Sequence, residues 1–137
     1  MKQIRPNALA IIVRNGNLLV HSAVDKKTGK HFGRLIGGGI EFGETSLVAL
    51  ERELQEELGV KLANEKLLTV IENIFEYNGE PNQEITFLYK ADIKDDNLNT
   101  KEKIKILDKE NEYAEWVSIA DVKERKIIVY PEINLYL

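Results

Sequence analysis

Six glutamates lie within one short stretch of the chain, and their spacing could place several of them around a metal ion. Residues 38–60 contain one basic residue, Arg52, and the acidic residues Glu41, Glu44, Glu51, Glu53, Glu56 and Glu57. At about 100° per residue, a helix brings the last three carboxylates within roughly a quarter-turn of one another. Such a cluster suits a hard, oxygen-seeking cation such as Mg²⁺, which is the usual partner of substrate phosphates.

The alternative interpretation is a solvated, glutamate-rich helix face, which is a common arrangement. Two observations favour the metal site. Glu53 and Glu57 are like charges four residues apart, which costs a few tenths of a kcal/mol, and no Lys or Arg four residues further on relieves them. A glycine-rich segment, residues 37–39, also leads directly into the acidic stretch.

A helix over residues 45–58 must position these carboxylates. Its apolar residues recur at helical spacing and are Leu47, Leu50, Leu54 and Leu58. Thr45 or Ser46 can cap the start of the helix, and Gly59 stands where a left-handed residue is favoured at its end. The apolar stripe and the carboxylate stripe therefore lie on different sides of one helix.

Strands are expected on both sides of this helix in the sequence. Two apolar runs, 8–13 and 18–20, flank Asn15-Gly16, a pattern typical of a β-hairpin. We further expect a short strand over 32–36 that the glycines at 37–39 interrupt, strands over 67–77 and 84–92 joined by 78–81, and a strand ending at 116–117. Residues 92–112 are expected to be a loop with a short element near 104–107, and Ser118 is expected to cap a short helix. These elements predict a single α/β sandwich domain, residues 1–137, with a mixed sheet.

Composition limits the classes of function. The chain has 137 residues, 43% of them hydrophobic, which is enough for a core without disulfides, and it contains no cysteine, which excludes cysteine-ligated metals. The net charge of −4 argues against charge-driven binding to long nucleic acids or acidic membranes. The apolar run at 8–13 is too short for a transmembrane helix and lacks a signal-cleavage site, so we expect a cytoplasmic protein.

The acidic stretch resembles the Nudix box. Gly38, five residues, Glu44, seven residues and then the segment RELQEELGV at 52–60 fill every fixed position of the family pattern G-x5-E-x7-R-E-U-x-E-E-x-G-U, where U is aliphatic. The strands before the box and the segment 115–117 after it also resemble the family. One departure is Ile36, which stands where many members have a proline, and no chemical group is lost by it.

The resemblance implies a Nudix-type α/β/α sandwich with a mixed central sheet and a loop–helix–loop catalytic motif. Nudix hydrolases cleave the pyrophosphate bond of a nucleoside diphosphate linked to another group. Such substrates include nucleoside triphosphates, nucleotide sugars, ADP-ribose and dinucleoside polyphosphates. They use Mg²⁺, with Mn²⁺ as an alternative. The implied metal ligands are Glu53, Glu56 and Glu57 with the backbone of Gly38. Glu44 and Arg52 would form a charge pair that fixes the loop against the helix.

The resemblance leaves the general base open. It is either Glu53 in the box or a glutamate on a loop before Trp116. Glu110 fits that loop best by its distance from Trp116, and Glu112 is the second choice. For both residues a solvated acidic loop is the favoured alternative. Glu84, on a predicted strand, is a further candidate for a carboxylate beside the metal.

The substrate is poorly defined by the sequence. Arg34, Tyr77 and Glu112 are candidates for substrate binding. Some dinucleoside-polyphosphate hydrolases carry a tyrosine near the position of Tyr77, but a tyrosine packed on the sheet explains it as well. His21 and His31 are expected to be strand and loop residues rather than metal ligands, because neither has a metal-binding partner at a recognisable spacing.

Two further alternatives remain. A Nudix domain without catalysis could sense a nucleotide or bind a protein, although such domains usually lose box glutamates that this chain keeps. The expected partner is a small nucleotide, not a long nucleic acid or a membrane. The apolar tail, residues 127–137, either completes the core or covers the partner in a homodimer, and the sequence favours the core.

Overall fold

A computed structural model describes residues 2–94 and 103–137. Within them the chain forms nine strands, two α-helices and a short 3-10 helix. In chain order they are β1 Ile4–Ile11, β2 Val13–Arg14, β3 Asn17–Val24, β4 His31–Gly39, α1 Ser46–Leu58, β5 Leu62–Tyr77, β6 Glu80–Ile93, β7 Ile104–Lys105, β8 Tyr113–Ser118, α2 Ile119–Lys123, β9 Val129–Tyr130 and η1 Asn134–Tyr136.

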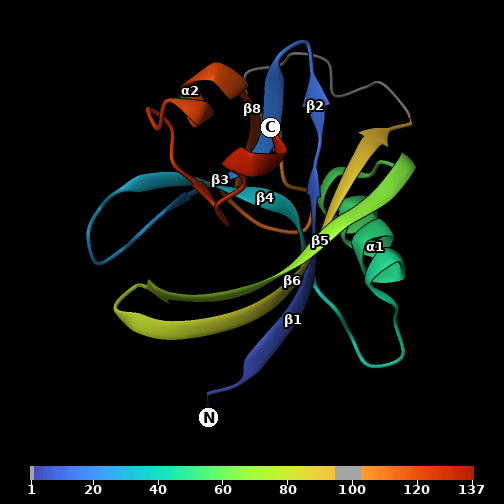
Figure 1. The fold of residues 1–137 in the computed structure, drawn as a ribbon, viewed down its shortest axis with the longest axis horizontal. Coiled ribbons are helices and arrows are strands. Elements are labelled where there is room, and N and C mark those ends of the chain that lie inside the picture. Colours follow the sequence, from blue (N-terminus) through green and yellow to red (C-terminus); the bar gives the residue numbers. More distant parts are fainter. Residues whose placement is uncertain (1, 95–102) are drawn as a thin grey trace.

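The strands make one mixed sheet (Figure 1), and two clusters of buried apolar residues pack against it. Its order is β5-β6-β1-β4-β3-β8-β7, with β2 paired to β3 and β9 paired to β4. The pairs β1/β6 and β4/β9 are parallel, and the other pairs are antiparallel. Helix α1 packs on one face through Leu50, Leu54 and Leu58, whereas Val122 of α2 and Ile133 belong to the core on the other face. The predicted α/β/α sandwich with a mixed sheet is confirmed.

Local sequence signals located several elements correctly. The Thr45 side chain accepts a hydrogen bond from the Val48 backbone N–H at 3.2 Å, and Gly59 ends α1 in the left-handed region with φ 66°. Ser118 caps α2 in the same way, accepting from the Asp121 backbone N–H. The hairpin at Asn15-Gly16 is also confirmed, as is a short strand near 104–107, which is β7. Residues 95–102 of the expected loop lie outside the described residues.

The glycines at 37–39 do not interrupt the sheet, which corrects the sequence prediction. Strand β4 continues through them to Gly39, and Gly37, Gly38 and Gly39 pair with β1. Gly37 has φ 141°, and a Cβ there would lie 2.1 Å from the Ala8 carbonyl oxygen. The close approach of β1 therefore requires glycine inside a strand, where propensity alone would favour a break.

The long hairpin of β5 and β6 also differs from the prediction at its ends. Strand β5 begins at Leu62 rather than at residue 67, and β6 begins at Glu80 rather than at residue 84. The turn consists only of Asn78 and Gly79, which both have positive φ, as the tightest hairpin turns require. Pro81 belongs to β6, at a point before β1 begins to pair with it.

The C-terminal segment completes part of the core, as expected. Val129 and Ile133 are buried with the residues beneath α2, whereas Leu135 is 94% exposed. No helix within residues 2–94 and 103–137 is both long and apolar enough to span a lipid bilayer.

Candidate active site

Helix α1 presents its carboxylates next to the end of β4. The apolar stripe of the helix faces the sheet, so the side chains at 53, 56 and 57 lie along one edge of that contact. Glu57 is buried, with 2% of its side chain exposed, whereas 18% of the Glu53 side chain and 46% of the Glu56 side chain are exposed. Exposure to solvent therefore increases from Glu57 through Glu53 to Glu56.

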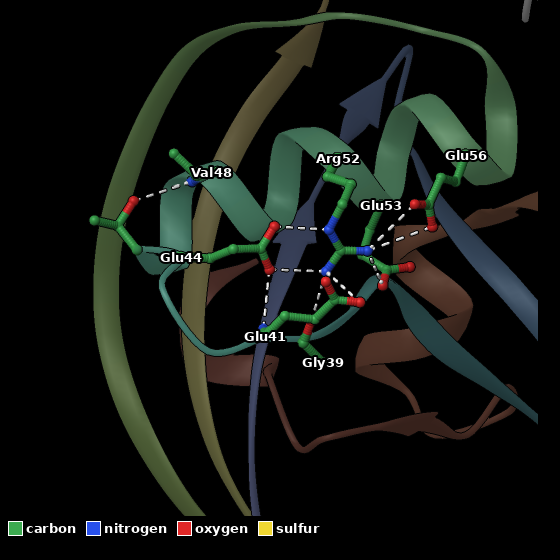
Figure 2. Close-up of polar contacts among 8 residues, drawn as sticks. Gly39, Glu41, Glu44, Val48, Arg52, Glu53 and Glu56 are labelled. Atoms are coloured by element: carbon green, nitrogen blue, oxygen red, sulfur yellow. Dashed lines mark hydrogen bonds and ion pairs between the residues drawn. The ribbon is translucent and has the colours of Figure 1, made fainter.

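Arg52 joins the loop before α1 to the helix and to β4 (Figure 2). Its Nε and Nη2 donate to the two Glu44 carboxylate oxygens at 2.7 and 2.9 Å, a bidentate pair. Nη2 also donates to the Gly39 carbonyl oxygen at 3.0 Å. The Arg52 hydrogen bonds, followed by one from the Glu41 backbone N–H, lower the pKa of Glu44 to about 2. Glu44 is therefore ionised at any physiological pH, and its pairing raises the pKa of Arg52.

The same guanidinium contacts the carboxylates of the helix. Arg52 Nη1 lies 3.0 Å from Glu53 Oε1 and 3.4 Å from Glu56 Oε2. One cation thus neutralises part of the charge that Glu53 and Glu56 bring together.

Gly38 lies directly against the Glu53 carboxylate. A Cβ at position 38 would be 2.5 Å from Glu53 Cδ and 2.7 Å from both of its oxygens. Only glycine leaves room for a carboxylate at that distance from the strand. The structure thereby brings together two of the residues that the sequence assigned to one site.

Glu57 is an unsatisfied buried carboxylate. Its Oε1 atom has no hydrogen-bond partner among the described residues. Burial, and next the charge of Glu53, raise the pKa of Glu57 to about 8, and burial likewise raises the pKa of Glu53. Buried polar atoms in native proteins are nearly always paired, and an unpaired one needs an explanation. An oxygen ligand for a cation has this combination of burial, charge and free lone pairs.

His21 is a site residue that the sequence reasoning missed. It lies on β3, with 9% of its surface exposed. Its Nε2 is 2.8 Å from Glu112 Oε1, and its Nδ1 is 3.8 Å from Glu57 Oε2. Burial lowers the pKa of His21, against the charge of Glu112. The sequence contained a signal for this position. His21 lies two residues after Leu19 on the same strand, so both side chains face the core under α1.

The contacts of His21 distinguish Glu112 from Glu110, the two candidate glutamates of the loop before Trp116. Glu112 is linked through His21 to Glu57, whereas Glu110 is exposed and makes no hydrogen bond or ion pair within residues 2–94 and 103–137. Glu84 lies on β6, four residues before Leu88, so the two side chains share one face of the strand. The Leu88 side chain is in the core beneath α2. Glu84 is therefore on the sheet face opposite the box.

Arg34 and Tyr77 are further along the same sheet. Arg34 is exposed on β4, directly across from His21 on β3. Its positive charge acts on Glu57 and opposes the rise in the pKa of that carboxyl. Tyr77 ends β5 and contacts Phe32, with ring centroids 5.9 Å apart.

The carboxylate oxygens of α1 suit a hard divalent cation, although their side chains do not converge on one metal position. Among the described residues, no three Asp, Glu or His side chains converge as a ready-made cage. The buried, unpaired oxygen of Glu57 and the carboxylate of Glu53 against the Gly38 backbone are nevertheless the oxygen ligands that Mg²⁺ prefers. Together these two carboxylates provide negative charge for a cation that could also bind a substrate phosphate.

Comparison with known sequences locates the chain within one family. The model of the NUDIX domain matches residues 3–134. A curated relative, the RNA pyrophosphohydrolase of Psychromonas ingrahamii, is 41% identical over 73 residues, which make up 53% of this chain and 39% of that protein. The matched region thus spans well under half of the relative's length.

Solved structures share the fold over most of the chain. A NUDIX hydrolase from Nitrosomonas europaea superposes with a TM-score of 0.68 at 19% identity, covering 97% of this chain and 84% of the other. A MutT NUDIX hydrolase from Burkholderia pseudomallei gives a TM-score of 0.64 at 24% identity, covering 87% and 86%. With the family model spanning nearly all residues and the acidic helix in place beside β4, the chain belongs to the NUDIX domain family.

Proposed function

We propose that the protein is a Mg²⁺-dependent Nudix pyrophosphohydrolase that cleaves a nucleoside diphosphate linked to another group into a nucleotide and a phosphorylated remainder. This proposal rests on two carboxylates of one helix. The buried Oε1 atom of Glu57 has no hydrogen-bond partner among the described residues, and the Glu53 carboxylate lies against Gly38. The family assignment and the names of the related hydrolases support the same class of reaction.

The proposed ligands of the cation are Glu53, Glu56 and Glu57, with the backbone carbonyl of Gly38. When bound, the cation supplies charge neutralisation for the phosphates and a more acidic water. Arg52 and Glu44 hold the loop and helix in register, so that the carboxylates stay at fixed positions. Fixed positions matter because phosphoryl transfer depends mainly on orientation and electrostatics.

A carboxylate must also accept the proton of the attacking water. Glu53 and Glu112 are the two candidates that the geometry favours, because Glu53 lies against Gly38 and Glu112 is held by His21. In either case the water oxygen attacks one phosphorus, the bridging P–O bond breaks, and the departing phosphate carries the electron pair. Glu110 has no contact within the described part of the chain that would hold it near Glu57.

A substrate screen tests the proposal. Nucleoside triphosphates, nucleotide sugars, ADP-ribose, dinucleoside polyphosphates and 5′-triphosphorylated RNA would be incubated with Mg²⁺ or Mn²⁺, and the products separated by chromatography. RNA is included because one relative is named an RNA pyrophosphohydrolase. We expect release of a nucleotide, or of pyrophosphate from RNA, that stops when the cation is chelated.

Variants of the box identify the site. Glu56→Gln and Glu57→Gln are expected to lower kcat by about 100-fold or more while the protein stays folded. Glu51→Gln is the matched control, since Glu51 is exposed and lies about half a turn round α1 from Glu53. Unchanged Mg²⁺-dependent turnover in both site variants would refute the assignment. Nucleotide binding without hydrolysis of any compound would instead support a sensor domain.

A further inference from the structure

We propose that Lys105 is a positioning residue for the candidate active site. Its ammonium group holds the β7–β8 loop, residues 106–112, in the shape that keeps the Glu112 carboxylate against His21. The inference rests on the proposed function, because Glu112 is one of the two candidate bases. It extends that function to a residue outside the box, which acts on the reaction through another side chain.

The β7–β8 loop is closed at its base. The Ile106 backbone N–H donates to the Glu112 carbonyl oxygen at 3.0 Å, which continues the pairing of β7 with β8. The side chains of Ile104 and Ile106 are buried in the core under α1. Residues 107–111 are all exposed. The core therefore fixes the start of the loop and not its tip.

The start of the loop is also fixed to the end of α1. The Leu107 backbone N–H donates to the Glu57 carbonyl oxygen at 2.8 Å. That carbonyl is among the last four of the helix, which have no partner within it. The Leu107 side chain lies beside Gly59, where a Cβ would be 3.2 Å from Leu107 Cδ1. The loop is therefore bound to the backbone of a proposed cation ligand.

Lys105 ties the tip of the loop to its base. Its Nζ donates to the Ile106 carbonyl oxygen at 3.0 Å and to the Lys109 carbonyl oxygen, three residues further on. An ammonium group has three N–H donors, and hydrogen bonds from a charged donor are stronger than those from a neutral one. Lys105 makes no ion pair within residues 2–94 and 103–137, so its charge is directed at these two carbonyls.

The shape of the loop determines where the Glu112 carboxylate lies. Glu112 ends the loop, and its Oε1 atom is 2.8 Å from His21 Nε2, while His21 Nδ1 is 3.8 Å from Glu57 Oε2. The Glu112 side chain is 43% exposed, so packing alone does not hold it there. The loop thus reaches Glu57 at both of its ends, through Leu107 to the backbone and through Glu112 and His21 to the carboxylate. A loop without Lys105 would lose the second of these connections.

Variants of two neighbouring lysines separate this role from a general loss of charge. Lys105→Met removes every donor from the side chain, whereas Lys105→Arg keeps a charged donor. Lys103→Met is the matched control, because Lys103 is an exposed lysine two residues earlier. Its Nζ lies 5.8 Å from the centroid of the Tyr113 ring, and it makes no hydrogen bond within the described ranges. Thermal unfolding would establish that each variant is folded.

The imidazole of His21 reports the position of Glu112 without any turnover. The chain has two histidines, so the ring ¹H–¹³C correlations in an NMR spectrum are assigned by His31→Gln alone. At one fixed pH, we expect Lys105→Met to shift the His21 signals in the same direction as Glu112→Gln and to leave those of His31 in place. Lys105→Arg and Lys103→Met should keep both sets of signals. Wild-type His21 signals in Lys105→Met would overturn the inference.

Steady-state kinetics test whether this position matters for the reaction. Lys105→Met should lower kcat by about tenfold with KM nearly unchanged, because a displaced base affects the chemical step more than binding. Lys105→Arg should restore most of the activity, and Lys105→Met should cause no further loss in Glu112→Gln. Unchanged kcat in Lys105→Met, or additive losses in the double variant, would overturn the inference. Absence of hydrolysis by the wild type, with the His21 signals shifting as expected, would count against the proposed function alone.

Discussion

At the scale of single residues, the proposed metal site would set a proton and a cation in competition for one buried carboxyl group. Glu57 has a raised pKa because it is buried and because Glu53 lies near it. The neutral acid is the form that burial favours, and the anion is the form that a cation needs. We therefore expect binding of the proposed cation to release a proton below about pH 8.

This competition predicts a pH dependence of stability in the absence of divalent cations. The pKa of Glu57 rises from 4.5 to about 8 on folding, so its stabilising contribution is complete below about pH 4.5 and is lost as the pH rises through about 8. The thermal midpoint of the wild type in chelator should fall across this window relative to Glu57→Gln. Differential scanning fluorimetry measures both curves. Parallel curves would show that Glu57 does not titrate in the window, and added Mg²⁺ should reduce the difference.

Arg52 and Glu44 are expected to act as one unit. Arg52→Lys keeps the charge but loses the bidentate pair, and Glu44→Gln loses the charge that the pair needs. Each change should lower kcat by about tenfold, because the loop between β4 and α1, which carries Glu41 and Glu44, is no longer fixed to α1. The double variant should be little worse than either single one. Additive losses in steady-state kinetics would mean that the two residues act separately.

His21 gives a means of choosing between the two candidate bases. Its imidazole holds Glu112 at 2.8 Å and lies beside Glu57. If Glu112 accepts the proton, Glu112→Gln should lower kcat by about 100-fold and remove the acidic limb of the pH–rate profile. His21→Leu should lower kcat by about tenfold with KM nearly unchanged. Retention of that limb in Glu112→Gln would assign the base to Glu53.

At the scale of elements, β4 determines where Glu53 lies. Gly38→Ala would place a methyl group 2.5 Å from Glu53 Cδ, so the carboxylate must move. We expect kcat to fall by about 100-fold, since small displacements of catalytic groups have effects of that size. Gly39→Ala is a close control, because the nearest atom to its Cβ is the Pro6 carbonyl oxygen at 4.0 Å. Equal activity of the two variants, measured as kcat, would show that this contact is not needed.

Elements defined by local chemistry were predictable from the sequence. Helix α1 has its cap at Thr45, its apolar spacing and its left-handed Gly59 all within the segment itself. The short helix after Ser118 has the same advantage. The family pattern then located the carboxylates of the box on α1, although their roles were implied by resemblance rather than by spacing.

Features determined by distant contacts were not predictable in this way. Gly37 stays in β4 because the Ala8 carbonyl approaches it, and Gly38 does so beside Glu53. The link between His21 and Glu112 joins residues 91 positions apart, and no local pattern records it. The distance from Trp116 favours Glu110 in the sequence, and the contact between His21 and Glu112 adds an argument for Glu112 that the sequence does not contain.

At the scale of the whole molecule, negative charge is concentrated in one place. Residues 38–60 contain six acidic residues and one basic residue, a net −5, and the rest of the chain has a net +1. A polyphosphate would be repelled by this region until a cation is bound. The global value of −4 therefore comes from one loop and helix, where we propose the cation site, and not from an acidic protein surface.

The C-terminal segment is expected to contribute to stability at one position and not at another. Ile133 is 1% exposed in the core beneath α2, whereas Leu135 is 94% exposed. Ile133→Ala should lower the free energy of unfolding by about 2–4 kcal/mol, and Leu135→Ala should change it by less than about 0.5 kcal/mol. Urea denaturation measures both. A large loss for Leu135→Ala would point instead to a contact with a second molecule.

The position of β1 at the centre of the sheet has a consequence for how the chain folds. Its neighbours are β4 and β6, and the parallel pair with β6 joins Ile4 to Gln83. Strand β1 therefore completes its hydrogen bonds on both edges only after β6, much later in the sequence, has formed. Chains dominated by such non-local pairing fold slowly, because loop closure precedes the contacts that reward it. We expect the β5–β6 hairpin to form early and the N-terminal strand to be among the last parts to acquire amide protection.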